Sequence, residues 1–279
     1  EVNLNIRAKS GDTNVVMDIA SNGATSAANG SGLVVENQYI TSKIGDVSVK
    51  AGNFTSGTSG LLGEIDEGGR SNNKVHLSTT LGGMSVYMGN SGSSTGSTGF
   101  TSIDNNMYAG VSTKVAGFTV QAKKVSQTVD AFGIAGDVAG VSVRLETKSD
   151  DAANSDVTFG NITTDVNGVS LGYAWIDADA NALIGETDSS IFAQENGLTG
   201  TYAGDSNSQV MAKTSMAGNT VTVKAGTIGF ATAADLDYTQ VGVTRPLASG
   251  ATLAVTYTDL DVTTTTDKKT FEAELSVKF

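Results

Sequence analysis

The 279-residue chain contains no cysteine, one proline and one histidine. Without cysteine it cannot use a thiol nucleophile, a thiolate metal site or a disulfide framework. Basic residues are also scarce, since 17 lysines and arginines stand against 29 aspartates and glutamates, for a formal net charge of −12. A chain of this charge is a poor partner for nucleic acid. The sequence has no run of about 18 apolar residues, which excludes a transmembrane helix.

The clearest pattern that is present lies at the carboxyl end. Every second residue from Phe271 to Phe279 is apolar, and the residues between them are polar. Period two predicts a strand with one apolar and one polar face. The pattern recurs along the chain, yet only 39% of residues are hydrophobic, too few for two packed sheets. We therefore expect an all-β, transmembrane, antiparallel up-and-down β-barrel whose apolar face meets lipid and whose polar face encloses water.

Short turns and long connections alternate along the predicted strands. The short turns contain glycine, as in Ala116-Gly117, Ala139-Gly140 and Asn167-Gly168, which suits tight hairpins. Longer polar connections, such as 178–205, lie at the opposite strand ends. Outer-membrane barrels show this asymmetry, with short periplasmic turns and longer extracellular loops. The whole chain, residues 1–279, is predicted to form one barrel domain.

The number of strands depends on residues 2–20. The apolar positions are even from Val2 to Ala8 and odd from Val15 to Ile19, so this segment is one strand with a glycine bulge or a hairpin of two strands. The first alternative gives about 16 strands and the second gives about 17. If both termini lie on the periplasmic side the number is even, so we expect 16.

The apolar alternation also predicts which charged residues face the interior. A Lys or Arg at mid-depth on the lipid face would cost about 2–4 kcal/mol, so the strand cations should face inward. The alternative is that they cover the solvated face of a soluble sheet. Tyrosines near strand ends, together with Trp175, are expected to form interfacial girdles. The proposed basic wall comprises Lys50, Lys123, Arg144 and Lys224.

Two other chemical signals are open to a structural or a functional interpretation. His76, the single histidine, is expected to be a polar wall residue with Ser78 on the same face, and not a catalytic base. Asp177 and Asp179 could bind a structural Ca²⁺ through carboxylate oxygens, or could be solvated loop residues. We expect no catalytic residue, no enzyme activity and no cofactor besides this candidate calcium ion.

Three short motifs carry a resemblance to a known family. They are the opening Glu1-Val2-Asn3-Leu4, the hairpin 44–53, and the terminal Leu275-Ser276-Val277-Lys278-Phe279. In these the chain resembles the trimeric general diffusion porins of Gram-negative outer membranes, particularly the short, acidic type of alphaproteobacteria. The resemblance implies a homotrimer in outer-membrane lipid and lipopolysaccharide, exported with loss of a signal peptide. It also implies that the barrel assembly machinery recognises Phe279.

In that family a long loop folds into the barrel and carries carboxylates that face cations on the opposite wall. The candidate here is segment 54–72, whose Leu61, Leu62 and Ile65 should pack against the inner wall instead of meeting open solvent. Segment 91–104 is the alternative, because the family places this loop after the fifth strand. The carboxylates that would face the basic wall and set ion preference are Glu64, Asp66 and Glu67.

Two classes of function follow from these patterns. The first is a porin that forms a water-filled channel for passive diffusion of small hydrophilic solutes and ions. The second is a structural β-rich surface protein, such as a layer, sheath or adhesin, with no channel activity. The aromatic terminal strand and the difference between the two rims favour the porin.

Overall fold

The computed structural model describes residues 3–21, 33–55, 61–62, 70–90, 107–125, 128–179, 206–229, 234–248, 250–261 and 268–277. Within these ranges the chain forms 17 strands joined by turns. No helix in the described ranges is long and apolar enough to cross a membrane. The strands are β1 (Asn3–Ser10), β2 (Thr13–Ser21), β3 (Leu33–Ile44), β4 (Val47–Thr55), β5 (Arg70–Leu81), β6 (Met84–Asn90), β7 (Met107–Val115), β8 (Phe118–Val125), β9 (Val129–Val138), β10 (Val141–Asp150), β11 (Ser155–Val166), β12 (Val169–Ala178), β13 (Ser206–Met216), β14 (Asn219–Gly229), β15 (Leu236–Pro246), β16 (Thr252–Asp261) and β17 (Lys268–Ser276).

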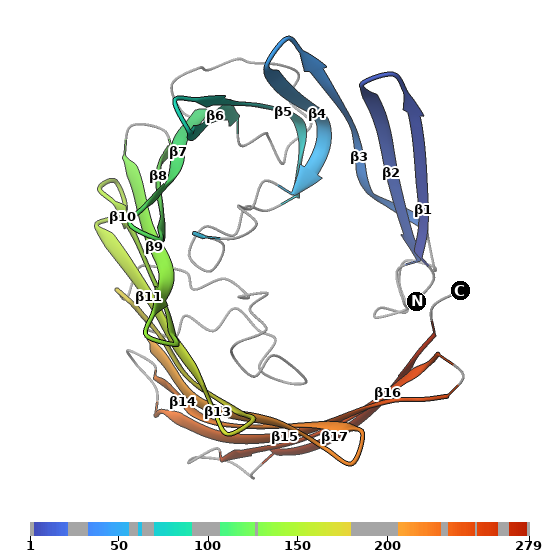
Figure 1. Cartoon of the computed structure of the whole chain (residues 1–279), viewed down its shortest axis with the longest axis vertical. Helices are drawn as coiled ribbons and strands as arrows, with labels where there is room; N and C mark the ends of the chain where they lie inside the picture. Colours follow the sequence, from blue (N-terminus) through green and yellow to red (C-terminus); the bar gives the residue numbers. More distant parts are fainter. Residues whose placement is uncertain are drawn as a thin grey trace.

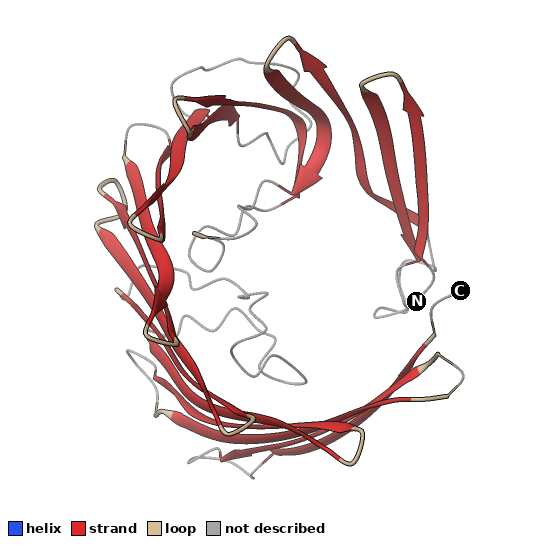
Figure 2. Cartoon of the chain, in the orientation of Figure 1, coloured by secondary structure: helices blue, strands red, loops and turns tan. Residues whose placement is uncertain are grey.

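The strands form one curved sheet in which each strand pairs antiparallel with the next along the chain. The sheet curls around a central space (Figures 1 and 2). Several turns place both central residues at positive φ, as at Ala116 (50°) and Gly117 (88°), which matches the twist of a two-residue hairpin. The predicted all-β, antiparallel up-and-down architecture is confirmed.

The expected count of 16 strands is wrong, because residues 3–21 form a hairpin and not one bulged strand. Ser10 pairs with Thr13 across a turn at Gly11-Asp12, and Gly11 has a φ of 58°. The two residues that flank a two-residue turn differ by three in number, so every cross-strand pair joins an even-numbered and an odd-numbered residue. Paired residues share a face, and the apolar positions therefore change from even to odd. The change in parity was therefore the signature of a turn. The described residues consequently form 17 strands.

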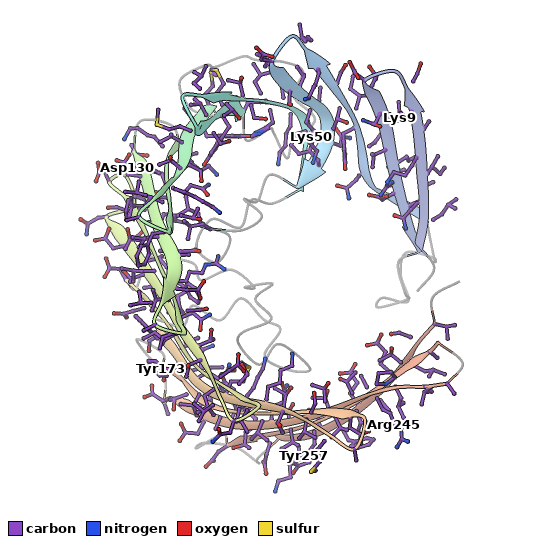
Figure 3. The ribbon with its side chains drawn as sticks, viewed as in Figure 1. Lys9, Lys50, Asp130, Tyr173, Arg245 and Tyr257 are labelled. Carbon is purple, nitrogen blue, oxygen red and sulfur yellow. The ribbon has the colours of Figure 1, made fainter. Side chains whose placement is uncertain are left out.

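The two faces of the sheet differ as the sequence predicts. Tyr173 and Tyr257 lie on the convex side and Lys50 on the concave side (Figure 3). Large apolar side chains on the convex face are open to the surroundings, with Val210 55% and Ile162 41% exposed. Buried polar side chains, by contrast, belong to the concave face: Lys74, Gln121, Lys123, Glu146 and Gln209. This is the reverse of a water-soluble sheet, and it is the distribution expected of a barrel in lipid.

Candidate functional site

Cross-strand pairing gathers basic and aromatic residues on the concave wall. Lys50 on β4 pairs with His76 on β5, which pairs with Gly89 on β6, which in turn pairs with Tyr108 on β7. Directly paired residues share a face, so this row points inward with Lys50. An adjacent row joins Tyr87, Gly110 and Lys123. We call the resulting set the cationic–aromatic cluster: Tyr39, Lys50, Phe54, Lys74, His76, Tyr87, Tyr108, Gln121 and Lys123.

Aromatic rings hold the lysines of this cluster in place. The Nζ of Lys50 lies 4.1 Å from the ring centroid of Tyr39 and 4.3 Å from that of Phe54. The two rings meet edge to face, with centroids 5.9 Å apart. Lys74, which is only 1% exposed, places its Nζ 5.6 Å from the same Phe54 ring. Cation–π contacts of this kind stabilise an ammonium group where water is partly excluded.

The other half of the cluster is a hydrogen-bonded stack of rings. His76 Nδ1 and the Tyr108 hydroxyl are 2.8 Å apart, and the His76 ring stacks on Tyr87 at 5.7 Å between centroids. Gln121 Nε2 donates to the Tyr87 hydroxyl at 2.8 Å. Lys123 Nζ lies 4.9 Å from the centroid of Tyr108. His76 is therefore a hydrogen-bonded wall residue, as the sequence predicted.

Two glycines make room for these rings to lie across the sheet. A Cβ at Gly89 would lie 2.6 Å from the hydroxyl oxygen of Tyr108, closer than real Cβ atoms approach. A Cβ at Gly110 would collide with the ring of Tyr87. The rings occupy the space that side chains at these positions would need. Glycine in a strand interior marks such a close approach.

Two described residues of segment 54–72 lie against the concave wall further along the sheet. Leu61 is 9% exposed and Leu62 fully buried. Leu62 packs in an apolar cluster with Val157, Phe159 and other residues of β9, β11 and β12. The leucines therefore pack as the sequence predicted. Leu62 also has a φ of 74°, and a branched residue keeps such a strained backbone only where its surroundings hold it.

An ion pair with a buried carboxylate anchors Leu62 to the wall. The Leu62 N–H donates to Glu146 Oε1 at 2.9 Å, and Arg144 forms a salt bridge with the same carboxylate oxygen. The Arg144 guanidinium also lies 5.5 Å from the centroid of the Phe159 ring. Glu146 has no exposed side-chain surface, so its charge depends on Arg144 and on the backbone donor. No pattern in the sequence indicated that Glu146 holds this segment.

The structure brings some of the predicted wall residues together and separates others. Lys50 and Lys123 belong to the cationic–aromatic cluster, whereas Arg144 lies beside Leu62. Lys224 lies on β14, in a row with Gln240 and Thr258. All four have the inward orientation that the apolar alternation predicted. The predicted loop carboxylates Glu64, Asp66 and Glu67, the alternative loop 91–104 and the terminal Phe279 lie outside the described residues.

The candidate calcium residues lie on the convex side near the long-connection rim. Both Asp177 and Asp179 are exposed. Asp179 Oδ2 accepts a hydrogen bond from the backbone N–H of Asp156 at 3.0 Å. Among the residues that the structure describes, no group of three or more His, Cys, Asp or Glu side chains could hold a metal ion. Asp179 thus serves to join two strand ends.

The girdle prediction is wrong for several tyrosines. Tyr87, Tyr108 and Tyr238 point inward and are 9%, 6% and 3% exposed. Tyr173 and Tyr257 do lie on the convex side (Figure 3). The signal that could have separated them is parity, since Tyr87 shares a face with Ser85 and not with Val86. Sequence reasoning tested parity for cations and overlooked the rings beside them.

Comparisons with known proteins bear on the fold. No protein-family model and no curated protein matches the sequence. Among solved structures, OccK11 (OpdR) of Pseudomonas aeruginosa is similar with a TM-score of 0.60 and 13% identity, over 97% of this chain and 87% of its own. OpdK of the same bacterium, solved with vanillate, has a TM-score of 0.58 and 10% identity, over 98% of this chain and 90% of its own.

A third similar structure belongs to a protein with a different role. Wzi of Escherichia coli is an outer-membrane protein involved in group 1 capsule assembly and is described as a carbohydrate-binding β-barrel. Its TM-score is 0.59 at 10% identity, over 98% of this chain and 75% of its own. What this chain shares with the three structures is the architecture, because sequence identities of 10% to 13% indicate a common fold and not a common activity. The chain has the fold of bacterial outer-membrane β-barrel proteins.

Proposed function

We propose that this chain is an outer-membrane porin, a water-filled channel through which small hydrophilic solutes and ions diffuse passively, without a catalytic step. The observation that carries this proposal is the inverted distribution of side chains. Apolar residues are exposed on the convex face, whereas lysines, glutamines and a glutamate line the concave face. A sheet of this kind is stable when hydrocarbon surrounds it and water fills it.

The inner wall supplies a physical basis for ion preference. Lys50, Lys74 and Lys123 contact the rings of one cluster, and cations on a pore wall attract anions and repel other cations. Segment 54–72 meets the wall at Leu62, so we propose that this segment narrows the passage. Its carboxylates, with the wall cations, would then form a transverse field that orients polar solutes.

The family resemblance supports several partner proposals. We propose that the chain is exported after removal of a signal peptide and inserted by the barrel assembly machinery, which would recognise Phe279. In the outer membrane of a Gram-negative bacterium it would form a homotrimer surrounded by lipid and lipopolysaccharide. The short-turn rim would face the periplasm and the long-connection rim the exterior.

Planar-bilayer recording tests the proposal. The refolded protein should produce stable conductance steps, grouped in threes if it is a trimer, and its gel mobility in SDS should change on heating. Protein that remains soluble without detergent and conducts no current would contradict the proposal. That result would favour the alternative of a structural surface protein, such as a layer, sheath or adhesin.

A further inference from the structure

The two edge strands of the sheet each have one described neighbour. β1 pairs with β2, and β17 pairs with β16. They lie at the two ends of the curved sheet and face one another across an opening (Figure 1). An open sheet edge in hydrocarbon leaves backbone N–H and C=O groups unsatisfied, and each unsatisfied group destabilises the structure. In a membrane these edges therefore require a partner.

The directions of the strands determine how the two edges would meet. Every pairing between described strands is antiparallel, so all odd-numbered strands run in the same direction. Both β1 and β17 run from the long-connection rim toward the short-turn rim. If they pair directly, the pairing is parallel, unlike every other junction in the described sheet.

The two strands also reach the same rim. Ser10, the last residue of β1, pairs with Thr13 across the short turn. Ser276, the last residue of β17, pairs with Thr252, the first residue of β16, directly after another short turn. Their carboxyl ends thus lie at the same rim, and strands of eight and nine residues can pair along most of their length.

The side chains of the two edges match on both faces. The convex face carries exposed Leu4 and Ile6 on β1 and exposed Phe271 and Leu275 on β17. Among the concave-face side chains that the structure describes, the charges on the two strands have opposite signs. They are Arg7 and Lys9 on β1 and Glu272 and Glu274 on β17. Opposite charges on neighbouring strands stabilise a pair, whereas like charges would separate it.

We propose that β1 and β17 close the sheet through a parallel seam, with the cations of β1 beside the carboxylates of β17 on the luminal side. Arg7 NH1 already lies 2.6 Å from Asp18 Oδ1, so Glu272 and Glu274 extend an existing charge network across the junction. The seam turns the open sheet into a barrel with an odd number of strands. Such barrels are known among mitochondrial channels.

Disulfide cross-linking tests the seam, because the natural chain has no cysteine to interfere. Single substitutions Asn5→Cys, Arg7→Cys or Lys9→Cys are combined with Thr270→Cys, Glu272→Cys, Glu274→Cys or Ser276→Cys in the full chain. The protein is folded in lipid vesicles, oxidised, and analysed by gel mobility and mass spectrometry. The pair Ile6→Cys and Met17→Cys, which are direct neighbours on β1 and β2, is the positive control.

A parallel seam predicts that the partner on β17 advances by two residues whenever the position on β1 advances by two. Combinations of one concave and one convex position, such as Ile6→Cys with Glu272→Cys, should cross-link at least tenfold less. Partners that move in the reverse direction would show an antiparallel junction and overturn the proposal. Absence of any cross-link, while the Ile6–Met17 control forms, would also overturn it by showing that something else covers the edges.

Discussion

Two stretches of the concave wall follow the same alternation but carry different chemistry. On β4–β8, lysines lie against rings and a histidine. On β13–β16 the wall carries Lys213 and Lys224, but two hydrogen bonds between its side chains join neutral groups. There the Tyr238 hydroxyl donates to Gln209 Oε1 at 3.1 Å and Gln240 Nε2 donates to Thr258 Oγ1 at 3.1 Å. The comparison teaches that strand periodicity decides which face is polar, whereas local packing decides what that face can do.

The largest expected loss of stability comes from removing a buried charged side chain, and removing a buried neutral side chain should cost less. Glu146→Ala leaves Arg144 without its carboxylate and Leu62 without its acceptor, so we expect a loss of about 3–5 kcal/mol. Gln209→Ala, on β13, removes an acceptor of Tyr238 and should cost about 1–3 kcal/mol. Urea unfolding of both variants in detergent micelles measures the difference. Equal losses would show that the ion pair does not anchor the loop.

The next largest loss of stability is expected when a methyl group is added where an aromatic ring crosses a glycine. Gly110→Ala forces the Tyr87 ring from its position and should destabilise the barrel by about 1–3 kcal/mol. Gly242→Ala is the matched control, because its Cβ would meet only Thr256 Oγ1, at 3.9 Å. We expect the control to unfold at nearly the urea concentration of the natural chain. A Gly110 variant as stable as the control would mean that the rings are not held against the sheet.

The charge difference between the two stretches should appear in ion preference. The double variant Lys50→Glu and Lys123→Glu reverses two charges within the cluster and should shift the reversal potential toward cation selectivity. Lys224→Glu, on β14, reverses a single charge and should shift the reversal potential in the same direction but less. Arg144→Glu should act likewise if it keeps the barrel folded, which heat-dependent gel mobility reports. Reversal potentials unchanged in a salt gradient would contradict the luminal assignment of these cations.

The smallest losses of stability are expected when a single tyrosine hydroxyl is removed from either stretch. Tyr87→Phe removes the acceptor of Gln121, and Tyr238→Phe removes the donor to Gln209. Each should cost about 1 kcal/mol, the usual net value of one such hydrogen bond. Only Tyr87→Phe should alter the conductance noise, because losing the hydrogen bond to Gln121 loosens the ring that stacks on His76 in the cationic–aromatic cluster. Identical noise from both variants would remove the functional distinction between the stretches.

Much of the fold could be predicted because period two requires only the local sequence. The inward direction of Lys50 and Lys123 followed from the valines and alanines around them. The strand count was wrong because a parity change at Gly11 admits a bulge or a turn, and only pairing decides between them. The anchoring role of Glu146 could not be predicted, since its contact with Leu62 joins residues that are distant in sequence.

The most direct test of the account asks which face of a strand meets water. Thr222→Cys and Val223→Cys are neighbours on β14 that point to the concave and convex sides, respectively. In lipid vesicles, a water-soluble, membrane-impermeant thiol reagent should label the cysteine at 222 and leave the one at 223 unmodified. Labelling of 223 with protection of 222 would contradict the account, because the apolar face would then be wet and the charged face covered.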